Sequence, residues 1–154
     1  FVQAIIGFFD LTALAVWGSG FYVLGRRLKY GATRVRFGTF PFLVGHPLKV
    51  TLELPRALRE FPELRATLRL AEQVWEQRRS GGKTTNELIT YERWAEEQVI
   101  PRDRIDGAVT LEFLVPAGAP VTDLASTPPR YWELQLDAET PGIDYHGRFL
   151  MPVY

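Results

Sequence analysis

The two histidines, His46 and His146, are the side chains in this sequence best suited to acid–base or metal chemistry. Asp144 lies two positions before His146, so on an extended strand both side chains would share one face and could supply two metal ligands. The sequence identifies no further metal ligand beside them. A turn aspartate followed by a surface histidine explains the same two residues more simply. His46 lies between Gly45 and Pro47 and is interpreted as a turn residue. The sequence therefore predicts no metal-binding residue.

The segment Gly82-Lys83-Thr84 has the residue types that end a phosphate-binding loop. Such a loop also needs an earlier glycine, and Gln77 occupies that position. The segment further lies in a predicted strand-to-strand loop rather than before a helix. We predict no nucleotide site and no other cofactor-binding residue.

Neither the serines nor the carboxylates of this sequence stand in a pattern that is typical of a catalytic site. Ser19 lies between two glycines at the wrong offsets for a hydrolase elbow, and Ser80 and Ser126 fall in predicted loops without a nearby base. The absence of cysteine excludes disulfides, thiolate metal sites and cysteine nucleophiles. Asp103 and Asp106 are interpreted as parts of a turn with local ion pairing. Glu92, Glu96 and Glu97 are interpreted as parts of a solvent-exposed face. The sequence predicts no catalytic residue and a protein that is not an enzyme.

Aromatic side chains allow two interpretations. Trp75, Trp94, Trp132 and Tyr131 could form a recognition surface, because such residues dominate binding hot spots. They could equally fill the interior of a sandwich, where they bury large areas. The core interpretation is favoured.

Charge is balanced over the 154 residues but unevenly distributed. No acidic residue stands between Asp10 and Glu53, a stretch that contains six basic residues. A nucleic-acid-binding chain would show a broad basic excess, so we predict no nucleic-acid partner. Positive charge beside an apolar run suits anionic lipid headgroups instead.

That apolar run covers residues 1–24 and is followed by Arg26, Arg27 and Lys29. Its length matches a membrane-spanning helix, and basic residues behind such a helix stay on the cytoplasmic side. We therefore expect an anchor in the inner (cytoplasmic) membrane with a soluble domain facing the cytoplasm. A helix lying along the membrane surface or against the domain is the alternative. Because the chain begins with Phe1, we expect it to be a fragment or a processed product, and we expect no cleavable signal peptide.

Asp10 is the unusual residue of this run, since a carboxylate in mid-membrane costs roughly 2.5–3.5 kcal/mol. One interpretation gives it a pairing partner on another membrane helix. The other places it near an interface or in a break between two shorter apolar pieces.

The rest of the chain alternates apolar and polar residues with the period of half-buried strands. Strands are predicted over residues 33–37, 48–54, 88–94, 109–115, 131–137 and 149–153. Residues 63–79 fit both a helix and a strand, and the strand is favoured because the neighbouring strands need partners. Residues 57–62 are expected to form a helical turn or an inserted loop. Turn residues at 80–82, 106–107 and 141–142 and a long link over 116–129 separate the strands.

Four segments in the last third of the chain occur together in one group of β-sandwiches. They read Gly107-Ala-Val-Thr-Leu-Glu-Phe-Leu-Val-Pro116, Tyr131-Trp-Glu-Leu-Gln-Leu-Asp-Ala138, Pro141-Gly-Ile-Asp-Tyr145 and Phe149-Leu-Met-Pro-Val-Tyr154. This combination resembles the arrestin-like domains attached to small bacterial inner-membrane proteins of unassigned activity. The resemblance covers residues 48–154 and implies a binding or scaffold module. It transfers no binding residues, because the chain has one sandwich and no phosphate-sensing polar core.

Together these features predict an all-β fold: a single immunoglobulin-like or arrestin-like antiparallel β-sandwich behind an N-terminal apolar helix. The expected organisation is an anchor helix (1–25), a basic juxtamembrane segment with the first strand (26–47) and the sandwich (48–154). We expect a non-catalytic protein-binding or scaffold module, with lipid contact and self-association as further expectations. Two alternatives stay open: an enzyme acting on lipid or envelope precursors, and a structural subunit of a membrane complex. Loops at 79–86 and 117–129, or an exposed sheet edge, are the expected contact surfaces.

Overall fold

The computed structural model describes residues 17, 20, 24–25, 29–80, 82–105, 107–139 and 144–154. The described residues at 17, 20, 24–25 and 29–30 are helical. The predicted anchor helix lies mostly outside the described residues, as do Asp10, Arg26 and Arg27. Within the described part of the chain, no helix combines the length and apolar character needed to cross a bilayer. Lys29 is described, and its ammonium nitrogen lies 4.8 Å from the centroid of the Tyr30 ring.

The first sheet contains two strands whose alternation is clear in the sequence and one shorter strand. β1 (Arg34–Phe37), β2 (Pro47–Glu53) and β5 (Ala108–Leu114) pair antiparallel in the order β1-β2-β5. Along β2, Leu48, Val50 and Leu52 are buried while the residues between them are partly exposed. The alternation therefore predicted both the strands and the face that each one buries.

The second sheet contains the segment that the sequence left ambiguous. β3 (Glu63–Ser80) is a strand, as favoured, and pairs antiparallel with β4 (Lys83–Pro101) on one side and β6 (Arg130–Ala138) on the other. β7 (Tyr145–Met151) completes the order β4-β3-β6-β7. Two short 3₁₀ helices interrupt the strands: η1 (Arg56–Glu60), in the region expected to form a helical turn or a loop, and η2 (Arg102–Arg104).

The core lies between the inner faces of the two sheets. Its largest fully buried side chains include Trp132 and Phe113 from the two sheets, Phe42 from the segment between β1 and β2, and Tyr30 from the segment before β1. Trp132 also donates its Nε1–H to the Pro120 carbonyl at 2.8 Å, which satisfies its one polar atom. The predicted all-β antiparallel sandwich is confirmed.

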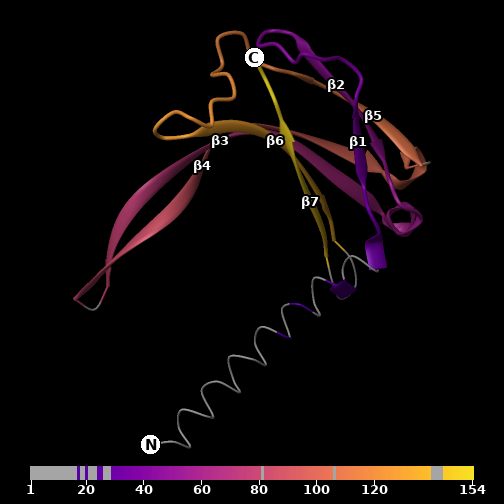
Figure 1. The fold of residues 1–154 in the computed structure, drawn as a ribbon. Helices are drawn as coiled ribbons and strands as arrows, with labels where there is room; N and C mark the ends of the chain where they lie inside the picture. The colour runs from indigo at the N-terminus through magenta and orange to yellow at the C-terminus, as the bar shows by residue number, and fades with distance from the viewer. Residues whose placement is uncertain are drawn as a thin grey trace, which may run out of the picture.

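β3 and β4 continue far beyond the sandwich (Figure 1). β3 pairs with β6 only from Arg65 to Glu72, whereas its pairing with β4 continues to Ser80 and Lys83. We call the two-stranded extension, residues 73–80 and 82–90, the arm. A register shift at Leu70/Ala71 marks its base.

Two predictions fail at the arm. The strand expected over residues 88–94 is longer and includes the polar residues from Lys83 onward. The loop expected over residues 79–86 is the paired end of a hairpin, in which Gly82 takes φ +81° beside the closing pair Ser80 and Lys83. The polar residues at the start of β4 do not alternate with apolar ones, so the sequence does not predict a strand there. They form a strand because they pair with β3.

Candidate functional site: the arm and the cleft at its base

The most exposed apolar side chains of the arm lie directly opposite each other. Trp75 on β3 pairs in register with Leu88 on β4, and they are 68% and 46% exposed. The core interpretation is therefore wrong for Trp75, because this residue lies beyond Glu72, where the pairing of β3 with β6 ends. It is confirmed for Trp132, which is fully buried, and Trp94 packs on it with ring centroids 5.3 Å apart.

The backbone of the arm presents two open edges. The N–H of Gln73 donates to the Pro129 carbonyl at 3.0 Å, so alternate β3 residues direct their backbone groups to the β6 side. Beyond Gln73, this side of β3, which includes Trp75, has no partner strand among the described residues. β4 is the last strand of its sheet, so its outer edge is also unpaired by the described strands. Such edges are templates for pairing with another chain.

Polar contacts hold the arm on the face opposite Trp75. The Tyr91 hydroxyl donates to Glu76, and this hydrogen bond, together with desolvation and the Glu76 charge, raises the pKa of Tyr91 above its ordinary value. Arg78 lies 3.6 Å from Glu87 across the hairpin. These pairs connect the two strands, and the ion pair and hydrogen bond that they form lie on the face of Glu76 and not on that of Trp75.

A cleft opens at the base of the arm, between the second sheet and the link from β5 to β6. Its volume is about 410 Å³. Two arginines and one carboxylate stand among apolar walls. The lining residues are Leu70, Glu72, Arg93, Trp94, Pro116, Ala119, Pro120 and Arg130. The sequence analysis named Trp94 and the link over 116–129, but not Arg93, Arg130 or Glu72.

His146 has a partner that the sequence analysis missed. Its Nδ1 bonds the carboxylate of Asp137, which lies opposite it where β6 pairs with β7. Arg148 donates from Nε to His146 Nε2 at 2.8 Å. Both ring nitrogens are therefore engaged, and Nε2 is an acceptor in this arrangement, with its lone pair held by a guanidinium. Asp144 stands just before β7, and no group of three potential metal ligands occurs among the described residues.

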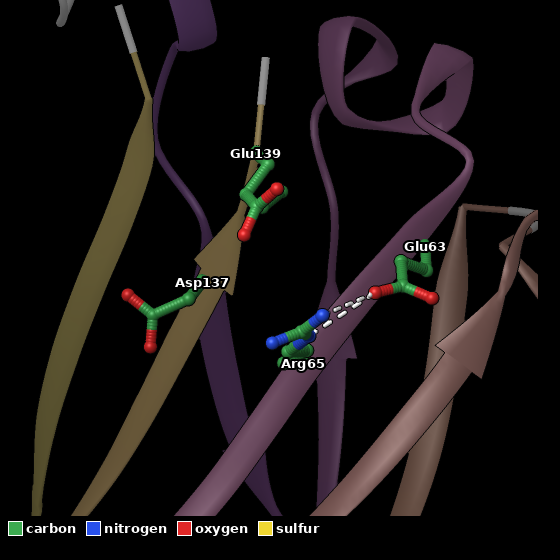
Figure 2. A pocket seen from close by; sticks show the side chains of 5 residues that line it. Glu63, Arg65, Asp137 and Glu139 are labelled. Atoms are coloured by element: carbon green, nitrogen blue, oxygen red, sulfur yellow. Dashed lines mark hydrogen bonds and ion pairs between the residues drawn. The ribbon is translucent and has the colours of Figure 1, made fainter.

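A small pocket of about 60 Å³ adjoins this pair (Figure 2). Figure 2 shows Arg65 on β3 bonding Glu63, with Asp137 and Glu139 on the β6 side. The hydrogen bond and charge of Glu63, followed by the charges of Glu139 and Glu97, raise the pKa of Arg65 above its ordinary value. Glu63 thus forms a surface ion pair with Arg65, and Asp137 pairs with His146.

The outer face of the second sheet contains one buried ion pair. Arg69 donates from Nε to Glu133 at 2.6 Å, and Glu133 is only 7% exposed. Arg69 also lies 3.7 Å from Glu92, one of the acids interpreted as a solvated face. This arrangement is structural: it satisfies the only charged side chain found buried in the described residues.

The remaining sequence candidates lie in separate strands, turns and helices of the described chain and do not gather into one site. Lys83 and Thr84 begin β4 rather than a helix, which removes the phosphate-loop geometry. The Ser126 hydroxyl donates within its own turn, to Asp123 and Pro128 carbonyls. His46 lies in a turn, as predicted, and donates from Nδ1 to the Val44 carbonyl at 3.1 Å. Asp103 lies in η2, Ser80 ends β3, and Glu96 and Glu97 lie in β4. Ser19 and Asp106 lie outside the described residues.

No protein-family model and no curated protein sequence matches this chain. Among solved structures, it is similar to the crystal structure of Spo0M, a sporulation control protein from Bacillus subtilis. The identity is 12%, the TM-score is 0.45, and the match covers 79% of this chain and 48% of Spo0M. The chain thus spans about half the length of that protein. A likeness of this size assigns neither activity nor partner.

Proposed function

We propose that this protein is a membrane-tethered, non-catalytic β-sandwich of the arrestin-like type that binds another protein through the arm. The observation that carries the proposal is the exposed Trp75–Leu88 pair on a hairpin that projects beyond the sandwich. Aromatic residues with large exposed area are typical anchors of protein interfaces. The two open edges of the arm add backbone groups that a partner strand can bond.

The arm has charges that restrict how it can pair. Charged side chains stand near both strands' ends, among them Arg78, Arg79 and Lys83, with Glu87 on β4. Charged residues on an open edge disfavour indiscriminate strand pairing. A partner must therefore match the charges as well as the Trp75 face, which gives the surface selectivity.

The tether and its location rest on the sequence. Residues 1–24 are apolar, and the basic residues Arg26, Arg27 and Lys29 follow them. These features support an inner-membrane anchor with the sandwich on the cytoplasmic side and lipid contact at the basic segment. The two alternatives, an enzyme on lipid or envelope precursors and a structural subunit paired through Asp10, draw support from no described contact.

Site-specific photocrosslinking in intact cells tests the arm. A photoreactive amino acid placed at Leu88 in the full chain should give a heavier, protein-containing adduct, because this position lies beside Trp75 on the binding face. The same label at Leu150, which is 50% exposed on β7 of the sandwich, is the matched control and should give none. Trp75→Ser should reduce the Leu88 adduct by at least fivefold, since one hot-spot side chain contributes about 1–2 kcal/mol or more.

Mass spectrometry of the adduct identifies the partner, and a second copy of this chain would make the interaction self-association. Absence of any adduct from Leu88, or identical adducts from Leu88 and Leu150, would refute binding through the arm.

A further inference from the structure

The cleft at the base of the arm contains an arginine without an acidic partner. Arg130 is the first residue of β6, and its Nε is buried and bonded by no described group. No ion pair between described residues includes its guanidinium, although Arg69 and Arg93 nearby both have one. A guanidinium stays charged in proteins, and a buried N–H without an acceptor is unfavourable. A ligand atom that accepts a hydrogen bond from Arg130 Nε would therefore be favourable in this position.

Each of the two carboxylates nearest in register has one oxygen bonded to another group. Glu72 lies directly opposite Arg130 where β3 pairs with β6, yet its Oε1 accepts from Arg93 Nε at 3.2 Å and Nη2 at 2.5 Å. Asp123 lies opposite Arg130 in an isolated bridge, yet its Oδ1 accepts from the backbone N–H groups of Ala125 and Ser126 at 3.1 and 3.0 Å. The cleft thus contains two arginines and one carboxylate, and that carboxylate pairs with Arg93 and not with Arg130.

The other walls of the cleft are apolar and held in place. Trp94 packs against the buried ring of Trp132, and the Trp132 indole bonds the carbonyl of Pro120. Leu70 and Pro116 complete this side. The volume of about 410 Å³ is within the range of small-ligand sites, which combine apolar walls with a few polar groups.

We propose that this cleft binds a carboxylate carried by an apolar group, with Arg130 bonding the carboxylate and Trp94 and Pro120 flanking the apolar part. Arginine can bond a carboxylate through two parallel N–H groups, and Arg93 shows a carboxylate bound by a guanidinium in the same cleft, with Nε and Nη2 both donating to Oε1 of Glu72. The carboxylate can come from an acidic side chain of an extended peptide or from a free organic acid. Glu72 and Trp75 lie on opposite faces of β3, so the site is distinct from the binding face of the arm.

Calorimetric titration of the full chain in a neutral detergent tests the site. The probes are 3-phenylpropionate with its amide, and acetyl-Phe-Glu-amide with acetyl-Phe-Gln-amide. Each acid should bind saturably and at least tenfold more tightly than its neutral counterpart, because charge-assisted bonds to Arg130 exist only for the acid. The tighter of the two acids identifies the source of the carboxylate.

Variants separate the site from general charge effects. Arg130→Gln should weaken both acids at least tenfold, whereas Arg102→Gln, an exposed arginine of η2, should leave them unchanged. Trp75→Ser should also leave them unchanged, which separates this proposal from the function of the arm. Equal binding of acid and amide by the unaltered chain would overturn the proposal even if Arg130→Gln failed to fold. Undiminished binding by folded Arg130→Gln, or no saturable binding of either acid up to about 10 mM, would overturn it too.

Discussion

Glu133 and Arg130 stand on the same strand, β6, and each has a buried polar atom: the carboxylate of Glu133 and the Nε of Arg130. Glu133 is bonded by Arg69, which comes from a position 64 residues earlier in the chain. Arg130 has its nearest carboxylates bonded to other groups. A satisfied buried charge stabilises one arrangement of the sheet, and an unsatisfied one is a candidate for a ligand. The first belongs to the scaffold and the second to the proposed cleft.

Glu133→Gln should lower the free energy of unfolding by roughly 2 kcal/mol. This lies between a lost charge-assisted hydrogen bond and a broken, fully buried ion pair, because the Arg69 side chain is still 17% exposed. Glu112→Gln is the control, since its ion pair with Lys49 is about half exposed on both sides and should contribute less than about 0.5 kcal/mol. Urea denaturation measures both variants, and equal effects would contradict a structural role for the Arg69–Glu133 pair.

At the scale of elements, the arm differs from the strands that it continues. The part of β3 before Glu72 has neighbours on both sides and contributes Leu64, Ala66 and Leu68 to the core. The part beyond Gln73 contributes no residue to the buried core of the described chain. A two-stranded hairpin is at best marginally stable by itself, so this arm depends on the sheet at its base. An element that stabilises so little of the fold is available for binding.

Replacing residues 75–88 by Asn-Gly should leave the sandwich folded. This change joins Val74 and Ile89, which already form a cross-strand pair, through a two-residue turn. We expect the free energy of unfolding to change by less than about 1 kcal/mol, because no buried core residue is removed. Denaturation and circular dichroism measure this, with Trp132→Ala as the destabilising comparison at about 3–5 kcal/mol. A loss above about 2 kcal/mol would show that the arm supports the fold.

At the scale of the whole molecule, one sandwich presents surfaces of different kinds. The second sheet extends into the arm, and the cleft lies where the arm leaves the sandwich, beside the link from β5 to β6. The outer face of the same sheet contains the ion pairs of Arg65, Arg69 and His146. This division places the two proposed binding surfaces at the arm and its base, with the body of the sandwich as their support.

The sequence predicts that the apolar segment, residues 1–25, holds the molecule at the membrane. The full chain should sediment with membranes and resist extraction by salt and alkaline carbonate, because an apolar segment of this length partitions into lipid. Removing residues 1–28 should release residues 29–154 into the supernatant as a folded sandwich. Changing Arg26, Arg27 and Lys29 to Gln tests the basic flank, and protease accessibility should then show loss of the cytoplasmic orientation. Recovery of the full chain in the supernatant without detergent would contradict the tether.

The sequence by itself determined which segments of the sandwich form most of its strands, because alternation of apolar and polar residues is a local consequence of the two-residue period of a strand. It identified β2, β5 and β6 and the faces that they bury, and it favoured a strand for β3. Only the tertiary structure decided that Trp75 is exposed, that Asp137 meets His146, and that Arg130 lacks an acid. Each of these depends on which strand lies alongside and where its pairing ends, and residues far apart in the chain supply those neighbours. Burial and charge pairing are properties of neighbours in space, so the spacing of residues along one segment cannot contain them.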